Sequence, residues 1–235
     1  PVQGRQNRKY RLQCAGGKDE HMIRKEEITR VLEAASARGI EFAELFLEDR
    51  EETNIPCVER AVQGVKSLRI YGAGLYLIQG LQNVYLYTNQ VTEAALMELV
   101  ERGAQMLEVK ARAAAAGLVL TERSWHNPCP VVRYPSTVRN QDKIQVLMQA
   151  DKAARNAGVN VRSLNLNYFD TDQRVLIANT EGLYTTDRRV TSRLRMQAVV
   201  ADGADAYGTW DDYTKAQGFE AFEDEAAYTG FAQDM

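Results

Sequence analysis

Histidine and cysteine side chains are the first candidates for chemistry, because both bind zinc and a cysteine thiolate is a strong nucleophile. The sequence holds only His21 and His126 among histidines, and Cys14, Cys57 and Cys129 among cysteines. His126 and Cys129 form an HxxC pair, yet zinc needs three or four converging ligands and no second pair lies nearby. We interpret the pair as an incidental surface feature, and we expect no metal site and no bound cofactor in this chain.

Nucleophilic catalysis finds no better support. Cys57 follows a proline and Cys129 lies between two prolines, and a Cys-His-Asn site would have to be built around His126 without any local signature. No serine stands in a GxSxG context. We therefore expect idle thiols and no catalytic residue. An odd number of cysteines without a CxxC pair favours a reducing compartment, and so a cytoplasmic location.

Glycines and paired carboxylates are further candidates for binding and catalysis. Gly72-Ala-Gly74 is too short for a phosphate-binding loop and lacks a GK[ST] ending, so the sequence predicts a tight hairpin there. Asp211 and Asp212 are neighbours and point to opposite faces of a strand, so they would not converge for acid-base work. Asp202 and Asp205 form a second carboxylate pair, which could in principle do acid-base work.

Four arginines follow one another closely in a predicted strand. If that strand is continuous, Arg189, Arg193 and Arg195 share one face and Arg188 lies on the other. This basic stripe has two interpretations, a docking surface for an acidic partner or the solvated face of an amphipathic strand. We favour the solvated face, because alternation already explains the pattern.

Composition bounds the class of protein. The chain has 235 residues, of which 45% are hydrophobic and 26% charged, which is an ordinary globular balance. No run of 18 apolar residues exists, so we expect no membrane partner. Residues 1–21 are basic and without apolar periodicity, and we interpret them as a leader or tag that is disordered. The remainder carries 24 basic against 30 acidic residues, which argues against direct nucleic-acid binding.

Hydrophobic periodicity indicates the elements of the first half. Ile28, Val31, Leu32 and Ala35 form the stripe of an amphipathic helix that stops at Gly39. Strand-like runs follow at 43–49, 65–70, 75–78 and 84–87, which predicts a small antiparallel sheet. A second helix begins after Thr92 and extends to about residue 107. Residues 121–140 contain three prolines and are interpreted as a connection.

The second half repeats this order. A helix from about residue 140 ends at Gly158, and Leu164, Leu166 and Tyr168 then alternate with polar residues in a half-buried strand. We expect turns at 170–173 and 179–182, a strand over 193–200, and a hairpin at Asp202-Gly203 onto a strand over 206–210. The fold class is therefore α+β, with helix plus antiparallel-sheet repeats over 22–117 and 140–210. Two unrelated α+β stretches remain the alternative.

Four segments, in order, carry a resemblance to a known family. They are residues 37–50, the run Gly72-Ala-Gly-Leu-Tyr76, the run Tyr85-Leu-Tyr-Thr-Asn89, and residues 179–189. Together they resemble the amino-terminal half of the TldD/PmbA family over about residues 23–210. The family is known as zinc metallopeptidases, once called modulators of DNA gyrase, that mature or degrade small peptides. The resemblance implies an α+β domain with intertwined repeats.

The chain departs from this family in one decisive respect. The family's zinc site, an HExxxH motif with a later ligand in a carboxy-terminal domain, has no counterpart in this sequence. The resemblance therefore implies a non-catalytic amino-terminal domain, inactive alone, that shapes the substrate chamber and the dimer of a peptidase acting on peptides or small proteins. A stand-alone peptide- or protein-binding module is the alternative. Zinc is expected only in the missing domain.

The end of the chain supplies a final expectation. Residues 211–235 hold seven acidic residues against Lys215 and no steady period, so we interpret them as an acidic tail or the start of a missing second domain. Aromatic residues gather around its start, and we expect them to form a surface that joins two copies or a related subunit, unless they fold back onto the core. These residues are Tyr207, Trp210, Tyr213, Phe219 and Phe222.

Overall fold

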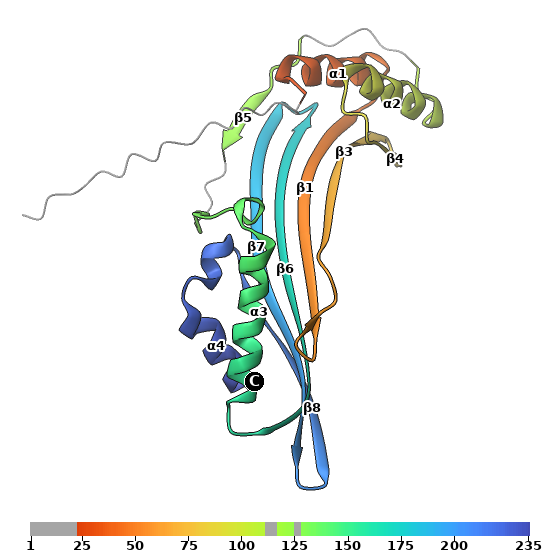
Figure 1. Cartoon of the computed structure of the whole chain (residues 1–235). Coiled ribbons are helices and arrows are strands. Elements are labelled where there is room, and N and C mark those ends of the chain that lie inside the picture. Colours follow the sequence, from red (N-terminus) through yellow and green to blue (C-terminus); the bar gives the residue numbers. More distant parts are fainter. Residues whose placement is uncertain (1–22, 111–116, 125–127) are drawn as a thin grey trace, which may run out of the picture.

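The computed structural model describes residues 23–110, 117–124 and 128–235, in which one long, curved sheet carries two pairs of helices (Figure 1). The helices are α1 (Lys25–Ala37), α2 (Glu93–Met106), α3 (Asn140–Arg155) and α4 (Glu225–Asp234), with 3-10 turns η1 (Pro135–Thr137) and η2 (Phe219–Phe222). The strands are β1 (Phe42–Val58), β2 (Ala61–Val62), β3 (Lys66–Gln79), β4 (Gln82–Thr88), β5 (Thr121–Ser124), β6 (Asn160–Asn179), β7 (Leu183–Asp202) and β8 (Asp205–Lys215).

The first long strands of the two halves pair at the centre of the sheet. The order is β4-β3-β1-β6-β7-β5, with β2 added to β1 and β8 added to β7. Every pairing is antiparallel except that of β5 with β7. The expected α+β class with antiparallel sheet is thus confirmed. The element order α1-β1-β3-β4-α2 recurs as α3-β6-β7-β8-α4.

Both helix pairs lie on the same face of the sheet. Along β1, Leu45 and Leu47 are buried beneath α1 and α2, whereas Ile55 and Cys57 are buried beneath α3 and α4. All four positions are odd-numbered, and alternate residues of a strand point to one face. The opposite face, which we call the helix-free face, carries the even-numbered residues of β1.

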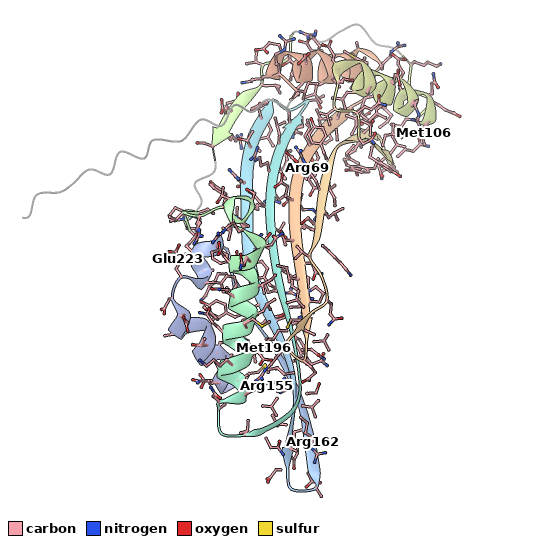
Figure 2. The ribbon with its side chains drawn as sticks, in the orientation of Figure 1. Arg69, Met106, Arg155, Arg162, Met196 and Glu223 are labelled. Atoms are coloured by element: carbon pink, nitrogen blue, oxygen red, sulfur yellow. The ribbon has the colours of Figure 1, made fainter. Side chains whose placement is uncertain are left out.

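Two hydrophobic cores fill the helix-covered face. The predicted stripe of Ile28, Val31, Leu32 and Ala35 is fully buried in the first core, as its helical spacing requires. In the second core, Leu164, Leu166 and Tyr168 turn toward the helices, as the alternation of that strand predicts. Met196 of β7 belongs to this second core and lies beside α3 in the view of Figure 2.

Two expected turns are wrong, because the strands run through them. β6 continues across residues 170–173, where Asp170 and Asp172 are buried and paired with Lys143 and Arg188. Ion pairs from neighbouring elements offset the cost of placing carboxylates inside a sheet. Gly72 and Gly74 likewise lie inside β3 rather than in a hairpin. The turn at 179–182 and the hairpin after Asp202 are confirmed.

Residues 211–235 are structured rather than a linker. They complete β8 and form η2 and α4, and Phe219, Phe222 and Tyr228 are buried in the second core. These apolar residues are interspersed with acidic ones in the sequence, so the segment showed no steady period, yet they pack in the same core as α3. The expected leader, residues 1–21, lies outside the described residues. None of the helices within the described ranges is both long and apolar enough to span a membrane.

Candidate functional site

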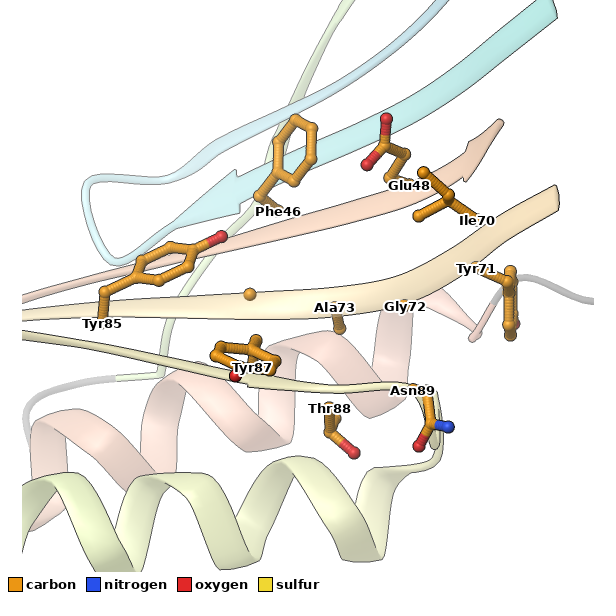
Figure 3. Close-up of a pocket in the computed structure, with 11 residues that line it drawn as sticks. Phe46, Glu48, Ile70, Tyr71, Gly72, Ala73, Tyr85, Tyr87, Thr88 and Asn89 are labelled. Carbon is orange, nitrogen blue, oxygen red and sulfur yellow. The ribbon is translucent and has the colours of Figure 1, made fainter. Parts of the chain in front are cut away.

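A groove on the helix-free face crosses β3 at two glycines, which have no side chains. Gly72 and Gly74 form its floor, and its cavity volume is about 240 Å³. In the strand register Glu48 lies opposite Gly72 and Phe46 opposite Gly74, so β1 supplies one wall. Tyr87 of β4 lies opposite Gly74 on the other side. Figure 3 shows Phe46, Glu48 and Tyr85 on the side of the sheet away from the helices.

The absence of a side chain at Gly74 makes room for Tyr85. A Cβ atom there would overlap the hydroxyl of Tyr85, which lies across β3 at this point. A Cβ atom at Gly72 would stand 2.8 Å from the backbone oxygen of Thr88. Glycine inside a strand often marks such a close approach, and here it replaces the hairpin that the sequence predicted.

Aromatic rings dominate the wall formed by β4. Tyr85 is 56% exposed and Tyr87 is 81% exposed, although both belong to a strand of the sheet. Tyr76 of β3 packs against Tyr85 with ring centroids 6.5 Å apart. Exposed aromatic side chains grouped on one face are typical of binding surfaces, since each combines a large apolar area with a polar tip.

Glu48 is the charged group of the groove. Gln173 donates a hydrogen bond of 2.6 Å to its Oε1, and Arg50 lies 3.3 Å from the same oxygen. The Glu48 side chain is 19% exposed, so its carboxylate is held in place at the edge of the groove. Arg50 is shared, because it lies equally close to Glu52.

The helix-free face changes charge across the sheet. Its β1 row carries Glu44, Glu48 and Glu52 against Arg50, whereas the β7 row carries Arg189, Arg193 and Arg195. As predicted, these three arginines share a face, and Arg188 lies on the other.

Each arginine of this stripe has an ion-pair partner. Arg195 forms two 2.9 Å hydrogen bonds to Asp212, which Arg193 approaches to 3.5 Å, and Arg189 pairs with Asp187. The hydrogen bond from Arg195 lowers the pKa of Asp212. The stripe is thus a partly neutralised sheet face.

Of the thiol and metal candidates, only Cys57 and Cys129 lie among the described residues. Cys57 is buried in the second core, where burial raises the pKa of its thiol and so disfavours the nucleophilic thiolate. Cys129 is exposed, and His126, His21 and Cys14 lie outside the described residues. Within 23–110, 117–124 and 128–235, no three His, Cys, Asp or Glu side chains are placed to hold a metal ion. The part of the chain that the structure describes therefore does not fit a zinc centre.

Only one of the two carboxylate pairs separates. Asp211 and Asp212 point to opposite faces of β8, as their adjacency predicts, and Asp202 lies opposite Asp205 where the β7–β8 hairpin turns.

The aromatic group around the start of the last segment divides in two. Trp210 and Tyr207 are exposed, whereas Tyr213 is half-buried against the core. Phe219 and Phe222 are buried, so the expected single aromatic surface is wrong for them.

Sequence reasoning missed the residues that form the groove. Tyr85 and Tyr87 were assigned to a strand, but nothing marked their shared face as a site. The available signal was the alternation Tyr85-Leu86-Tyr87, in which the apolar leucine points to the core and both tyrosines point away from it. The second signal was a Gly-x-Gly sequence between apolar residues of strand type. Such a sequence is as compatible with a strand that another group approaches closely as with a turn.

Comparison with known proteins places this fold. A family model described as PmbA/TldA metallopeptidase domain 1 matches residues 43–115, and one described as the PmbA/TldA metallopeptidase central domain matches residues 133–233. The second match extends into residues 211–235. Together the two matches cover more than half of the chain.

Three solved structures share the fold. TldE from Thermococcus kodakarensis superposes with a TM-score of 0.68 at 11% identity, over 88% of this chain and 46% of that one. A putative modulator of DNA gyrase from Thermotoga maritima MSB8 gives 0.63 at 12% identity, over 82% and 43%. A putative modulator of DNA gyrase from Bacteroides thetaiotaomicron VPI-5482 gives 0.61 at 14% identity, over 82% and 45%.

The chain spans less than half the length of each of these structures. At such identities the structures support the fold alone, whereas the two family models match the sequence itself in the order of the chain. The family resemblance inferred from residues 23–210 is thereby confirmed. This chain belongs to the PmbA/TldD metallopeptidase family.

Proposed function

We propose that this chain is a non-catalytic part of a PmbA/TldD-type peptidase, and that it holds an extended segment of a peptide or small protein on its helix-free face. The observation that carries the proposal is the groove over Gly72 and Gly74, with aromatic walls on a sheet face that no helix covers (Figure 3). Bond cleavage, and the zinc that it needs, is assigned to a part of the protein outside these 235 residues. We assign the protein to the cytoplasm on its cysteine usage.

A groove of this shape suits a peptide better than a compact small molecule. Its floor is a flat stretch of strand, and its volume of about 240 Å³ lies below the range of drug-sized ligand sites. An extended peptide places alternate side chains on one side, so one of them can enter the groove while its neighbours lie on the sheet. A stand-alone peptide-binding module would use the same surface.

Photo-crosslinking tests whether peptides bind at this face. A benzophenone amino acid replaces Tyr87 in the groove or, as the control, Met106, which is 60% exposed at the end of α2. After irradiation with a mixture of unstructured casein peptides, we expect adducts at position 87 and none above background at position 106. Equal labelling at both positions, or none at 87, would reject the proposal.

We further propose that the chain associates with a second copy or a related subunit. Trp210 and Tyr207 on the β7–β8 hairpin are 68% and 58% exposed, and covering such apolar area releases roughly 25 cal/mol per Å². Light scattering at several concentrations tests this, with Trp210→Ala expected to weaken any dimer. A strictly monomeric mass up to high micromolar concentration contradicts it.

A further inference from the structure

We propose that the groove selects a lysine or arginine side chain of the bound peptide. This inference rests on the proposed function, since it names the side chain that a peptide on the helix-free face would place over Gly72 and Gly74. Three features of the groove support it: its narrow floor, its aromatic walls and Glu48, the one carboxylate among the described residues that line it.

The floor of the groove carries no β3 side chain at Gly72 or Gly74. The Tyr85 hydroxyl and the Thr88 backbone oxygen lie where their Cβ atoms would stand, so the floor is narrow. A long, unbranched aliphatic stem can lie along such a floor, and Phe46 and Ile70 border it with apolar surface. Lysine and arginine have such stems and routinely bury them while the charged group stays at a polar edge.

The walls suit a cation. Tyr85 and Tyr87 line one side and Phe46 the other, and Figure 3 shows the Tyr85 hydroxyl directed toward Phe46 across β3. Ammonium and guanidinium groups are attracted to the faces of aromatic rings. The chain itself uses this contact on the same face, where the guanidinium of Arg195 lies 5.6 Å from the ring centroid of Trp210.

The Glu48 carboxylate gives the groove a negative charge. Both contacts of Glu48, from Gln173 and Arg50, use Oε1, so we assign Oε2 to the incoming cation. Glu44 and Glu52 occupy the same row of β1, so three carboxylates face one guanidinium along this wall. An acidic side chain would be repelled by these carboxylates, and a neutral one would gain no attraction from them. Charge complementarity therefore favours a basic peptide.

Paired peptides test the inference with the 235-residue chain. Two fluorescent nonapeptides are identical except for a central lysine or its uncharged analogue norleucine, and fluorescence anisotropy measures their dissociation constants. We expect the lysine peptide to bind about fivefold or more tightly at low salt, and the ratio to shrink as ionic strength rises. A third peptide with central glutamate is expected to bind most weakly.

Variants locate the effect. Glu48→Gln should bring the lysine peptide to the affinity of the norleucine peptide and leave the latter unchanged. Tyr87→Leu, at an exposed position, keeps apolar area but removes a ring, and should weaken only the lysine peptide. The matched control is Glu51→Gln, which removes a charge from an exposed position on the opposite face of the same strand and should change neither affinity.

The outcomes separate the two proposals. If both peptides bind equally to the unmodified chain, the lysine preference is overturned while peptide binding stands. If neither peptide binds, the proposed function fails and the preference fails with it. A lysine preference that survives Glu48→Gln but disappears in Glu51→Gln also overturns the inference, because the cation would then lie on the helix-covered face.

Discussion

At the scale of single residues, a buried ion pair joins α3 to the sheet between the two cores. Lys143 Nζ lies 2.5 Å from Asp170 Oδ2, and both side chains are almost fully buried. Lys143 also donates a hydrogen bond to Thr53 Oγ1 on β1, the strand paired with β6 at this point. The pair explains how β6 can carry a carboxylate within its buried row.

Lys143→Met is expected to destabilise the fold strongly, because it leaves the Asp170 carboxylate buried without a counter-charge. We expect a loss of about 3–5 kcal/mol in the free energy of unfolding, measured by urea denaturation. The double variant Lys143→Met with Asp170→Leu should recover most of it. Arg139→Met, which breaks an exposed pair with Asp142, is the control and should cost less than about 1 kcal/mol. A small loss in Lys143→Met itself would show that the pair contributes little.

A second residue-scale prediction concerns alkaline pH. Tyr228 of α4 is buried and donates a hydrogen bond to Gln149, and burial raises its pKa to about 12. Since its folded pKa lies above the unfolded value near 10, the stabilisation is complete below pH 10 and is lost as pH rises toward 12. Urea denaturation at pH 8 and pH 11 measures this loss. The loss should be smaller in Tyr228→Phe, and an equal loss in both proteins would contradict the assignment.

At the scale of elements, η2 is tied to the segment before η1 by one carboxylate and one close backbone contact. Glu220 accepts hydrogen bonds from the backbone N–H groups of Val132 and Arg133, and also of Gly218. Burial alone would raise the pKa of Glu220, but these hydrogen bonds outweigh it and the pKa is lowered. This contact fixes residues 211–235 onto the domain, although their charge suggested a loose tail.

Gly218→Ala should loosen this attachment. A Cβ atom there would overlap the backbone carbonyl oxygen of Arg133, which a rotating side chain cannot relieve. We expect a loss of about 1–3 kcal/mol in the free energy of unfolding. The matched control is Gly208→Ala in β8, where a Cβ atom meets nothing within 4 Å and the effect should stay within about 0.5 kcal/mol. Equal effects of the two substitutions would contradict the close contact.

Element types were predictable from periodicity, whereas strand continuity was not. The stripe from Ile28 to Ala35 and the alternation from Leu164 to Tyr168 depend only on neighbours in sequence, and both are confirmed. Asp170, Asp172, Gly72 and Gly74 resemble turn residues locally. Their place inside strands depends on Lys143, Arg188 and Tyr85, which the fold brings from elsewhere in the chain. For the same reason the groove could not be assembled from sequence alone.

At the scale of the whole molecule, each core contains residues from a strand of the other half of the chain. β1 belongs to the first half, yet it contributes Ile55 and Cys57 to the core beneath α3 and α4. β6 belongs to the second half, yet it contributes Leu176 and Ala178 to the core beneath α1 and α2. The two strands are paired from Glu44 with Asn179 to Val58 with Asn165. The halves are therefore repeats in element order but a single unit in packing.

Severing the chain between residues 117 and 118 should accordingly abolish folding of the separate pieces. In residues 1–117 alone, the edge of β1 that pairs with β6 would be exposed to water, and the first core would lack Leu176 and Ala178. In residues 118–235 alone, the second core would lack Ile55 and Cys57. We expect neither fragment to show a cooperative thermal transition by circular dichroism. When co-expressed, the two should co-purify in equal amounts and regain one transition, below that of the intact chain because the link is lost. A fragment that unfolds cooperatively by itself would mean that its core is complete without the strand of the other half.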